Sequence, residues 1–223
     1  MSTSEVILKQ INSLVGDLVE MGLAQDQNYV FQRKLSSTSV EVTFPRAEHL
    51  SAVFNNQPYS EVYDILAAER ALVVKLPDGA LIQMQYLFEG GALERHRLAF
   101  FPSPHLEEFQ NNPEVYLEDA AYADIISRSI VPFPLHFDYD CRDSIWKELK
   151  HPKSHLSLGQ YENCRIPVSA PLAPACFMDF VLRNFYNTAF IQYSDKLLKS
   201  PWWFDDSILA AEQGVIYIKI PTS

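Results

Sequence analysis

Three consecutive stretches with β-strand character, separated by two turn dipeptides, constrain the fold of this chain more than any other feature. The stretches cover residues 71–76, 80–88 and 92–101, and the turns between them are Asp78-Gly79 and Gly90-Gly91. Such pairs suit tight hairpin turns because glycine adopts the positive φ angles that these turns require. The pattern therefore predicts a three-stranded antiparallel meander.

Further stretches alternate between apolar and polar residues and are bounded by turn residues, as half-buried strands are. They cover residues 28–35, 39–44, 133–140, 154–159, 164–168 and 215–220. The first two form a predicted hairpin with its turn at residues 36–38, and we expect the later strands to join the meander in one sheet.

A capping box opens the first predicted helix. Ser2 and Glu5 have the required spacing, and the helix runs to about Gly22. Its apolar stripe keeps heptad spacing and consists of Ile7, Ile11, Leu14, Leu18 and Met21. Such a stripe is typical of a helix that packs on its own domain, the interpretation we favour, and also of a short seam for a partner helix or second subunit.

Other segments have helical character. We expect helices over residues 46–54, over residues 61–70 with Ser60 as the cap, and from Pro174 to about Phe190, and a helical or irregular segment to about residue 130. Together the elements predict an α+β fold. Its antiparallel, meander-rich sheet has one polar face and is packed by N-terminal and C-terminal helices, in a single domain over residues 1–223.

Composition excludes several classes of protein. The chain of 223 residues is 48% hydrophobic and 21% charged, which is ordinary for a globular domain and too apolar for disorder. No apolar run approaches the roughly 20 residues of a membrane span, and the first residues lack a signal-peptide pattern, so we expect a cytoplasmic protein without a membrane role.

Cysteines and net charge narrow the field further. Cys141, Cys164 and Cys176 form no CxxC pair, which argues against a disulfide framework or a structural zinc site and favours burial as small apolar side chains. The formal net charge of −10 opposes generic attraction to phosphate backbones. A role in nucleic-acid binding therefore requires a local basic patch or bridging cations.

Strand alternation predicts which polar side chains share a face of the sheet, because residues two apart in a strand point the same way. The pooled polar set is Gln83, Gln85, Arg95, Arg97, His136, Asp138, Asp140, His155, Ser157 and Arg165. This set contains no lysine and is rich in His, Asp and Arg, the residues that bind metals and phosphates. The alternative is an ordinary solvated outer face of a half-exposed sheet, and composition alone leaves it open.

Metal-assisted phosphodiester hydrolysis is the reaction that such a face suits best. Same-face Cα atoms on one strand lie about 6.7 Å apart, so Asp138 and Asp140 could share a divalent cation, with His136 or His155 completing its shell. His155 and Asp138 are the predicted catalytic residues. The predicted phosphate-binding residues are Arg95, Arg97 and Arg165. A Ser157–His155–Asp138 triad is disfavoured because no nucleophile elbow surrounds the serine.

Several blocks of the chain resemble a bacterial family known only as a domain of unknown function, DUF2290. The blocks are residues 96–104, 135–140, 151–159, 164–168 and 180–186, and the His-Pro-Lys-Ser-His-Leu stretch at residues 151–156 is the most specific. The resemblance implies a prokaryotic protein and carries no reaction with it. A looser likeness to small toxin-like proteins of toxin–antitoxin loci, which also place Arg, Asp and His on a sheet, is an analogy only.

Two functional hypotheses follow. In the first, the chain is a nucleic-acid- or nucleotide-directed component of a phage-defence or toxin–antitoxin system that uses Asp138, His155 and Arg165, with a divalent metal ion as cofactor. In the second, it is a non-catalytic accessory subunit that binds a partner protein, or a second copy of itself, through its acidic surface and the apolar stripe of the first helix.

Overall fold

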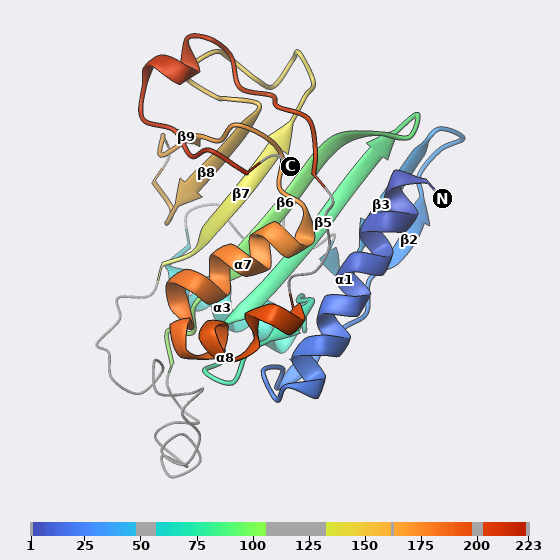
Figure 1. Cartoon of the computed structure of the whole chain (residues 1–223), viewed down its shortest axis with the longest axis vertical. Helices are drawn as coiled ribbons and strands as arrows, with labels where there is room; N and C mark the ends of the chain where they lie inside the picture. The colour runs from blue at the N-terminus through green and yellow to red at the C-terminus, as the bar shows by residue number, and fades with distance from the viewer. Residues whose placement is uncertain (1, 48–56, 106–132, 162, 198–202, 222–223) are drawn as a thin grey trace.

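The computed structural model describes residues 2–47, 57–105, 133–161, 163–197 and 203–221. These residues form one antiparallel sheet of nine strands with helices packed against it, which confirms the predicted α+β class. Figure 1 shows helices α1, α7 and α8 lying in one layer across a single face of the sheet. The opposite face therefore carries no helix from this layer.

The predicted meander forms the centre of the sheet. Along the main path the strands are β1 (Asp26–Gln27), β4 (Val74–Lys75), β5 (Leu81–Glu89), β6 (Ala92–Phe101), β7 (Leu135–Asp140), β8 (Ser154–Leu158) and β9 (Ile166–Pro167). The hairpin of β2 (Phe31–Lys34) and β3 (Ser39–Thr43) pairs with β5 beside β4. Gly79, Gly90 and Gly91 all have positive φ angles, as the predicted turns require.

Helix α1 (Thr3–Glu20) begins with the predicted capping box. The Ser2 N–H donates to Glu5 Oε2 at 2.9 Å, and the Glu5 N–H donates to Ser2 Oγ at 3.4 Å. Its apolar stripe is buried within the same chain, since Ile7 and Ile11 are 0% exposed. The stripe therefore packs on its own domain, and the alternative of a partner-binding seam is wrong.

Helix α3 (Tyr59–Ala68) replaces the helix expected over residues 61–70. Its N-cap is Pro58, and no side chain caps it, so the prediction of Ser60 as the cap is wrong. The helix expected over residues 46–54 lies mostly outside the described residues, as does most of the segment expected to be helical or irregular up to residue 130.

The long C-terminal helix expected from Pro174 to Phe190 is two helices, α7 (Pro174–Phe185) and α8 (Asn187–Leu197). They are separated at Tyr186, whose φ of −134° and ψ of 54° are not helical. The Tyr186 hydroxyl donates to Asp78 Oδ2 at 2.7 Å. This tertiary contact is absent from local sequence patterns, which explains why the break was not predicted.

The strand expected over residues 215–220 does not form. A short 3₁₀ helix, η3 (Glu212–Gly214), is followed by an irregular segment with only one parallel bridge, between Val168 and Ile218. Pro167 in the neighbouring strand has no N–H to extend a ladder, and Ile216 is 90% exposed. The three cysteines are half-buried and unpaired rather than fully buried.

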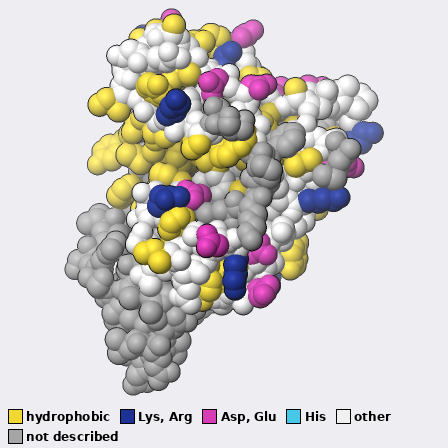
Figure 2. Space-filling model, viewed as in Figure 1, with side chains coloured by type: hydrophobic (Ala, Val, Ile, Leu, Met, Phe, Trp, Pro, Cys, Tyr) yellow, Lys and Arg dark blue, Asp and Glu magenta, His cyan; other side chains and the backbone are white. Residues whose placement is uncertain are grey.

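The two faces of the sheet differ sharply in character. Apolar side chains of β5, β6 and β7 pack beneath the helices: Ile82, Met84, Tyr86, Phe88, Leu98, Phe100, Leu135 and Phe137. On the outer surface of this helical side, acidic and basic side chains are scattered among hydrophobic ones (Figure 2). No helix in the described part of the chain is long and apolar enough to cross a membrane.

Candidate functional site

Strand register brings the predicted polar residues together on the face of the sheet opposite α7. Arg97 on β6 lies opposite Asp138 on β7, and Asp138 lies opposite His155 on β8. One row along the strands, His136 lies opposite Ser157, and one row the other way, Asp140 lies opposite Arg95. Directly opposite residues have Cβ atoms about 5 Å apart, so these side chains are near neighbours.

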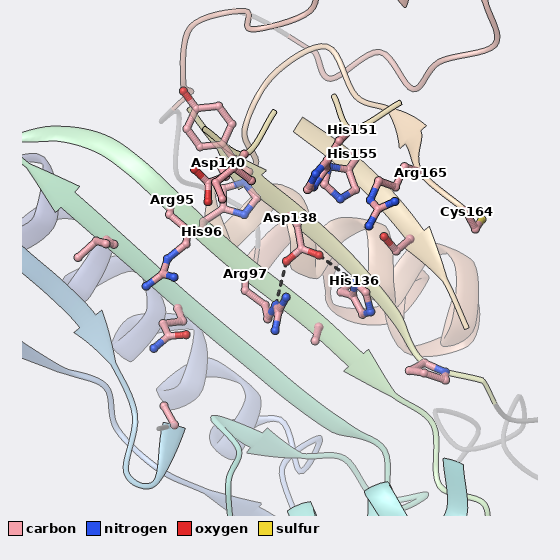
Figure 3. A pocket seen from close by; sticks show the side chains of 18 of the residues that line it. Arg95, His96, Arg97, His136, Asp138, Asp140, His151, His155, Cys164 and Arg165 are labelled. Atoms are coloured by element: carbon pink, nitrogen blue, oxygen red, sulfur yellow. Dashed lines mark hydrogen bonds and ion pairs between the residues drawn. The ribbon is translucent and has the colours of Figure 1, made fainter. Parts of the chain in front are cut away.

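A pocket of about 700 Å³ lies over these rows. Nine of the ten predicted residues line it, namely Gln85, Arg95, Arg97, His136, Asp138, Asp140, His155, Ser157 and Arg165. The tenth, Gln83, is buried, and its amide donates to the Ala71 carbonyl. Figure 3 shows the labelled side chains converging from β6, β7, β8 and the segment before β9.

Asp138 lies at the centre of this arrangement, between a guanidinium group and an imidazole ring (Figure 3). Its Oδ1 accepts from Arg97 Nε at 2.9 Å, and its Oδ2 is 3.0 Å from His136 Nδ1. Burial raises the pKa of the carboxyl, but Arg97 and the hydrogen bond from His136 outweigh it and hold the pKa well below its usual value. Because the carboxylate is ionised, His136 Nδ1 is the donor, and the tautomer with its hydrogen on Nδ1 has its lone pair on Nε2.

Arg97 uses only part of its hydrogen-bonding capacity within the described residues. Its Nε donates to Asp138, whereas its two terminal nitrogens make no hydrogen bond to any described residue. The Asp138 carboxylate raises the pKa of Arg97, so the guanidinium is always charged. The side chain is 42% exposed and can offer two N–H-bearing nitrogens to an anion.

Asp140 is paired with an arginine that the sequence interpretation missed. Arg142 Nε lies 2.9 Å from Oδ1 and 3.2 Å from Oδ2. Burial raises the pKa of Asp140. The hydrogen bonds from Arg142 and the nearby charge of Arg95 lower it by more, so the net pKa lies below its usual value. Each carboxylate predicted as a metal ligand is therefore already neutralised by an arginine.

The side chains of the predicted metal set, Asp138, Asp140 and His136, already bind one another or an arginine. Among the described residues no group of three or more His, Cys, Asp or Glu side chains is placed to hold a metal ion. The metal role of these residues stays a prediction, and their existing ion pairs count against it because a cation would have to displace the arginines.

His155 and His151 lie side by side at the β8 end of the pocket (Figure 3), with ring centroids 5.0 Å apart. His155 Nδ1 donates to the Pro152 carbonyl at 2.9 Å, so Nε2 carries the lone pair of the neutral ring. Burial, opposed by Asp138, lowers the pKa of His155 to about 4, and burial with Arg165 also lowers the pKa of His151. At neutral pH, His155 can accept a hydrogen bond and carries no positive charge.

Besides His96, which strand alternation places on the opposite face, sequence reasoning missed four arginine, glutamate or histidine residues that line the pocket: Arg33, Glu41, Arg142 and His151. Arg33 and Glu41 belong to the predicted β2–β3 hairpin, where Arg33 Nη2 lies 2.7 Å from Glu41 Oε2. Alternation along that hairpin could have added both to the polar face. The other two lie in the charged loop between β7 and β8, which has no periodicity to place its side chains.

A known protein family matches nearly the whole length of the chain. Residues 23–220 match the model of a family described as uncharacterized conserved protein, DUF2290. The chain belongs to this family. Every described residue that lines the pocket falls within the DUF2290 region, whereas the whole of α1 lies outside it. No curated protein and no solved structure matches the chain.

Proposed function

We propose that this DUF2290 protein is directed at nucleic acids or nucleotides: it binds their phosphate groups in the pocket on the polar sheet face and cleaves a phosphodiester there. The biological setting we propose is phage defence or a toxin–antitoxin system. The proposal is argued from the chemistry of the pocket, since the family description names no reaction.

A local reversal of charge is the observation that carries the proposal. The chain has a formal net charge of −10, yet among the described residues the pocket is lined by five arginines and three carboxylates. The arginines are Arg33, Arg95, Arg97, Arg142 and Arg165. Four histidines and no lysine belong to the described part of the lining. Arginine is the residue whose planar guanidinium matches phosphate oxygens in pairs, so an excess of arginine favours a phosphate-bearing ligand.

Individual roles follow from the geometry. Arg97 is held at Nε by Asp138 and presents its terminal nitrogens to a phosphate. Arg95 lies two residues away on the same strand, and Arg165 lines the pocket from the segment before β9. Asp138 acts through Arg97 and His136, which makes it a positioning residue. His155 Nε2 accepts a hydrogen bond from a hydroxyl or amino group of the ligand.

Binding of a fluorescently labelled single-stranded oligonucleotide, followed by anisotropy at several salt concentrations, tests the phosphate role. We expect Arg95→Met to weaken binding by about tenfold and to reduce the salt dependence, because one phosphate contact is lost. Arg183→Met is the matched control, since Arg183 is an exposed arginine of α7 outside this pocket. Equal affinity of Arg95→Met and the wild-type protein would contradict the proposal.

Cleavage of the same oligonucleotides tests the reaction. We expect Asp138→Asn and His155→Gln to reduce cleavage by about 100-fold or more, with melting temperatures close to that of the wild-type protein. Assays with EDTA and with added Mg²⁺ or Mn²⁺ test the metal-assisted form predicted from the sequence. Loss of activity together with loss of folding would show instead that Asp138 and His155 are structural.

The accessory-subunit hypothesis receives no support from the described surface. The helical stripe on which it depended is part of the core, as Ile7, Ile11 and Leu18 show. A protein partner or second copy stays a prediction, and light scattering of the purified protein, alone and with the product of a neighbouring gene, tests it.

A further inference from the structure

We infer that His136 is the general base of this pocket and that the nucleophile it activates is the 2′-hydroxyl of an RNA strand. This inference rests on the proposed function and sharpens it, since it names both the proton acceptor and the substrate class. The sequence interpretation had assigned catalysis to His155 and a metal-binding role to His136.

The Asp138–His136 pair has the arrangement of an oriented base. Asp138 Oδ2 holds His136 Nδ1–H at 3.0 Å, which fixes the tautomer and directs the lone pair to Nε2. A carboxylate in this position also stabilises the imidazolium that forms when Nε2 takes a proton. His136 lines the pocket and its side chain is 22% exposed, so a ligand can reach Nε2.

The neighbours of His136 leave space above its ring. On β6 the residue opposite it is Ala99, and on β8 it is Ser157, both with short side chains. One row along the strands lies Arg97, whose terminal nitrogens make no hydrogen bond to any described residue. Asp138 therefore holds a base and a phosphate-binding cation next to each other, one on each of its oxygens.

An internal nucleophile fits this arrangement better than water bound to a cation. Both oxygens of Asp138 and both oxygens of Asp140 are engaged by Arg97, His136 and Arg142. The 2′-hydroxyl of RNA lies next to the scissile phosphate, so binding the phosphate also positions the nucleophile, and DNA has no such group.

The reaction balances with these groups and water. His136 Nε2 takes the proton of the 2′-hydroxyl, and the 2′-oxygen forms a bond to phosphorus. The bond from phosphorus to the 5′-oxygen breaks, its electron pair stays on that oxygen, and a water molecule protonates it. The hydroxide that remains takes back the proton held by His136. Arg97 stabilises the charge that builds up on the non-bridging oxygens. The products are a 2′,3′-cyclic phosphate and a free 5′-hydroxyl.

The test uses the full chain and three single-stranded oligonucleotides of one sequence: RNA, 2′-O-methyl RNA and DNA. We expect cleavage of RNA alone, with a 2′,3′-cyclic phosphate on the product. His136→Ala should lower the RNA cleavage rate by about 100-fold or more while RNA affinity changes by less than about threefold. His105→Ala is the matched control, because His105 Nε2 also pairs with an aspartate, Asp64, at 2.9 Å outside this pocket.

The outcomes separate this inference from the function on which it rests. Cleavage of DNA or of 2′-O-methyl RNA at the RNA rate, or full activity of His136→Ala, would each overturn the inference alone. No cleavage of any of the three despite Arg95-dependent binding would overturn the inference and the proposed cleavage, and would leave the phosphate binding. If none of the three oligonucleotides binds in a manner that depends on Arg95, the proposed function fails together with it.

Discussion

The two faces of the central strands show how one sheet separates stability from chemistry. Beneath α7, Phe137 on β7 meets Phe177 and Phe180 edge to face at 6.2 and 5.0 Å between ring centroids. On the other side of the same strand, Asp138 holds an arginine and a histidine. Apolar burial dominates folding energetics, whereas partly exposed ion pairs contribute little, so the polar face can change its chemistry without loss of the fold.

A histidine on each face makes the contrast concrete. His96 and His155 are both buried, burial lowers the pKa of each to about 4, and both neutral rings carry their proton on Nδ1, but their Nε2 atoms have different roles. His96 Nε2 accepts from the Leu172 N–H at 3.1 Å and so ties β6 to the segment before α7. His155 donates through Nδ1 to Pro152 and keeps Nε2 as an acceptor. Both rings line the pocket, but Nε2 of His96 is used by the core, whereas Nε2 of His155 is left as an acceptor.

The largest expected effect comes from the helix-covered face. Phe177 is 0% exposed, so Phe177→Ala removes a full aromatic side chain from the core and should lower the free energy of unfolding by about 3–5 kcal/mol. Arg95→Ala on the polar face should change it by about 0.5 kcal/mol or less. Urea denaturation of both variants measures the difference, and similar losses would refute the division of roles.

Acid should destabilise the protein through the two buried histidines. Their folded-state pKa values of about 4 lie below the value of about 6.5 expected for unfolded chains, so the unfolded state binds more protons between these values. Stability is thus fully present above about pH 6.5 and is lost as the pH falls to about 4, by up to about 3 kcal/mol for each ring.

The variants His96→Gln and His155→Gln separate the contributions of the two histidines to this pH dependence of stability. In each variant, the number of protons taken up on unfolding, which sets the slope of unfolding free energy against pH between about 6.5 and 4, should fall by about one. Urea unfolding at several pH values measures the slope. An unchanged slope in one variant would show that its ring is not held neutral by the fold.

A smaller effect is expected from the Asp138–Arg97 pair. A double-mutant cycle with Asp138→Ala and Arg97→Ala should give a coupling energy of about 1 kcal/mol, because the guanidinium is half-exposed and water screens the pair. Nucleic-acid binding should fall in both single variants even though stability changes little. A coupling energy as large as the loss in Phe177→Ala would mean that the polar face also holds the fold together.

Local sequence signals predicted the elements whose determinants are local. The capping box of Ser2 and Glu5 and the turns at Gly79 and Gly90 act within a few residues, and the structure contains all of them. The break at Tyr186 and the missing strand near Ile218 depend on Asp78 and on Pro167, which are distant in sequence. Local sequence patterns do not predict such tertiary contacts.

The candidate site was predictable to the same extent and for the same reason. Strict alternation along β6, β7 and β8 placed Arg97, Asp138 and His155 on one face before their register was known. Alternation does not specify partners, so it did not indicate that Asp138 would bind His136 or that Arg142 from a loop would neutralise Asp140. The chemistry depends on those pairings.

The smallest expected effect comes from an exposed ion pair on α7, which serves as a reference for the Asp138–Arg97 pair of the pocket. Arg183 and Asp179 form an i,i+4 pair on α7 at 2.9 Å, with the arginine side chain 56% exposed. Arg183→Ala should lower the unfolding free energy by only about 0.3–0.5 kcal/mol, and added salt should weaken that effect because the pair is screened by water. Urea denaturation at low and high salt measures both. If the loss equals the coupling of Asp138 with Arg97, then the pocket confers no special environment on its ion pair, and the polar face differs from an ordinary surface only in composition.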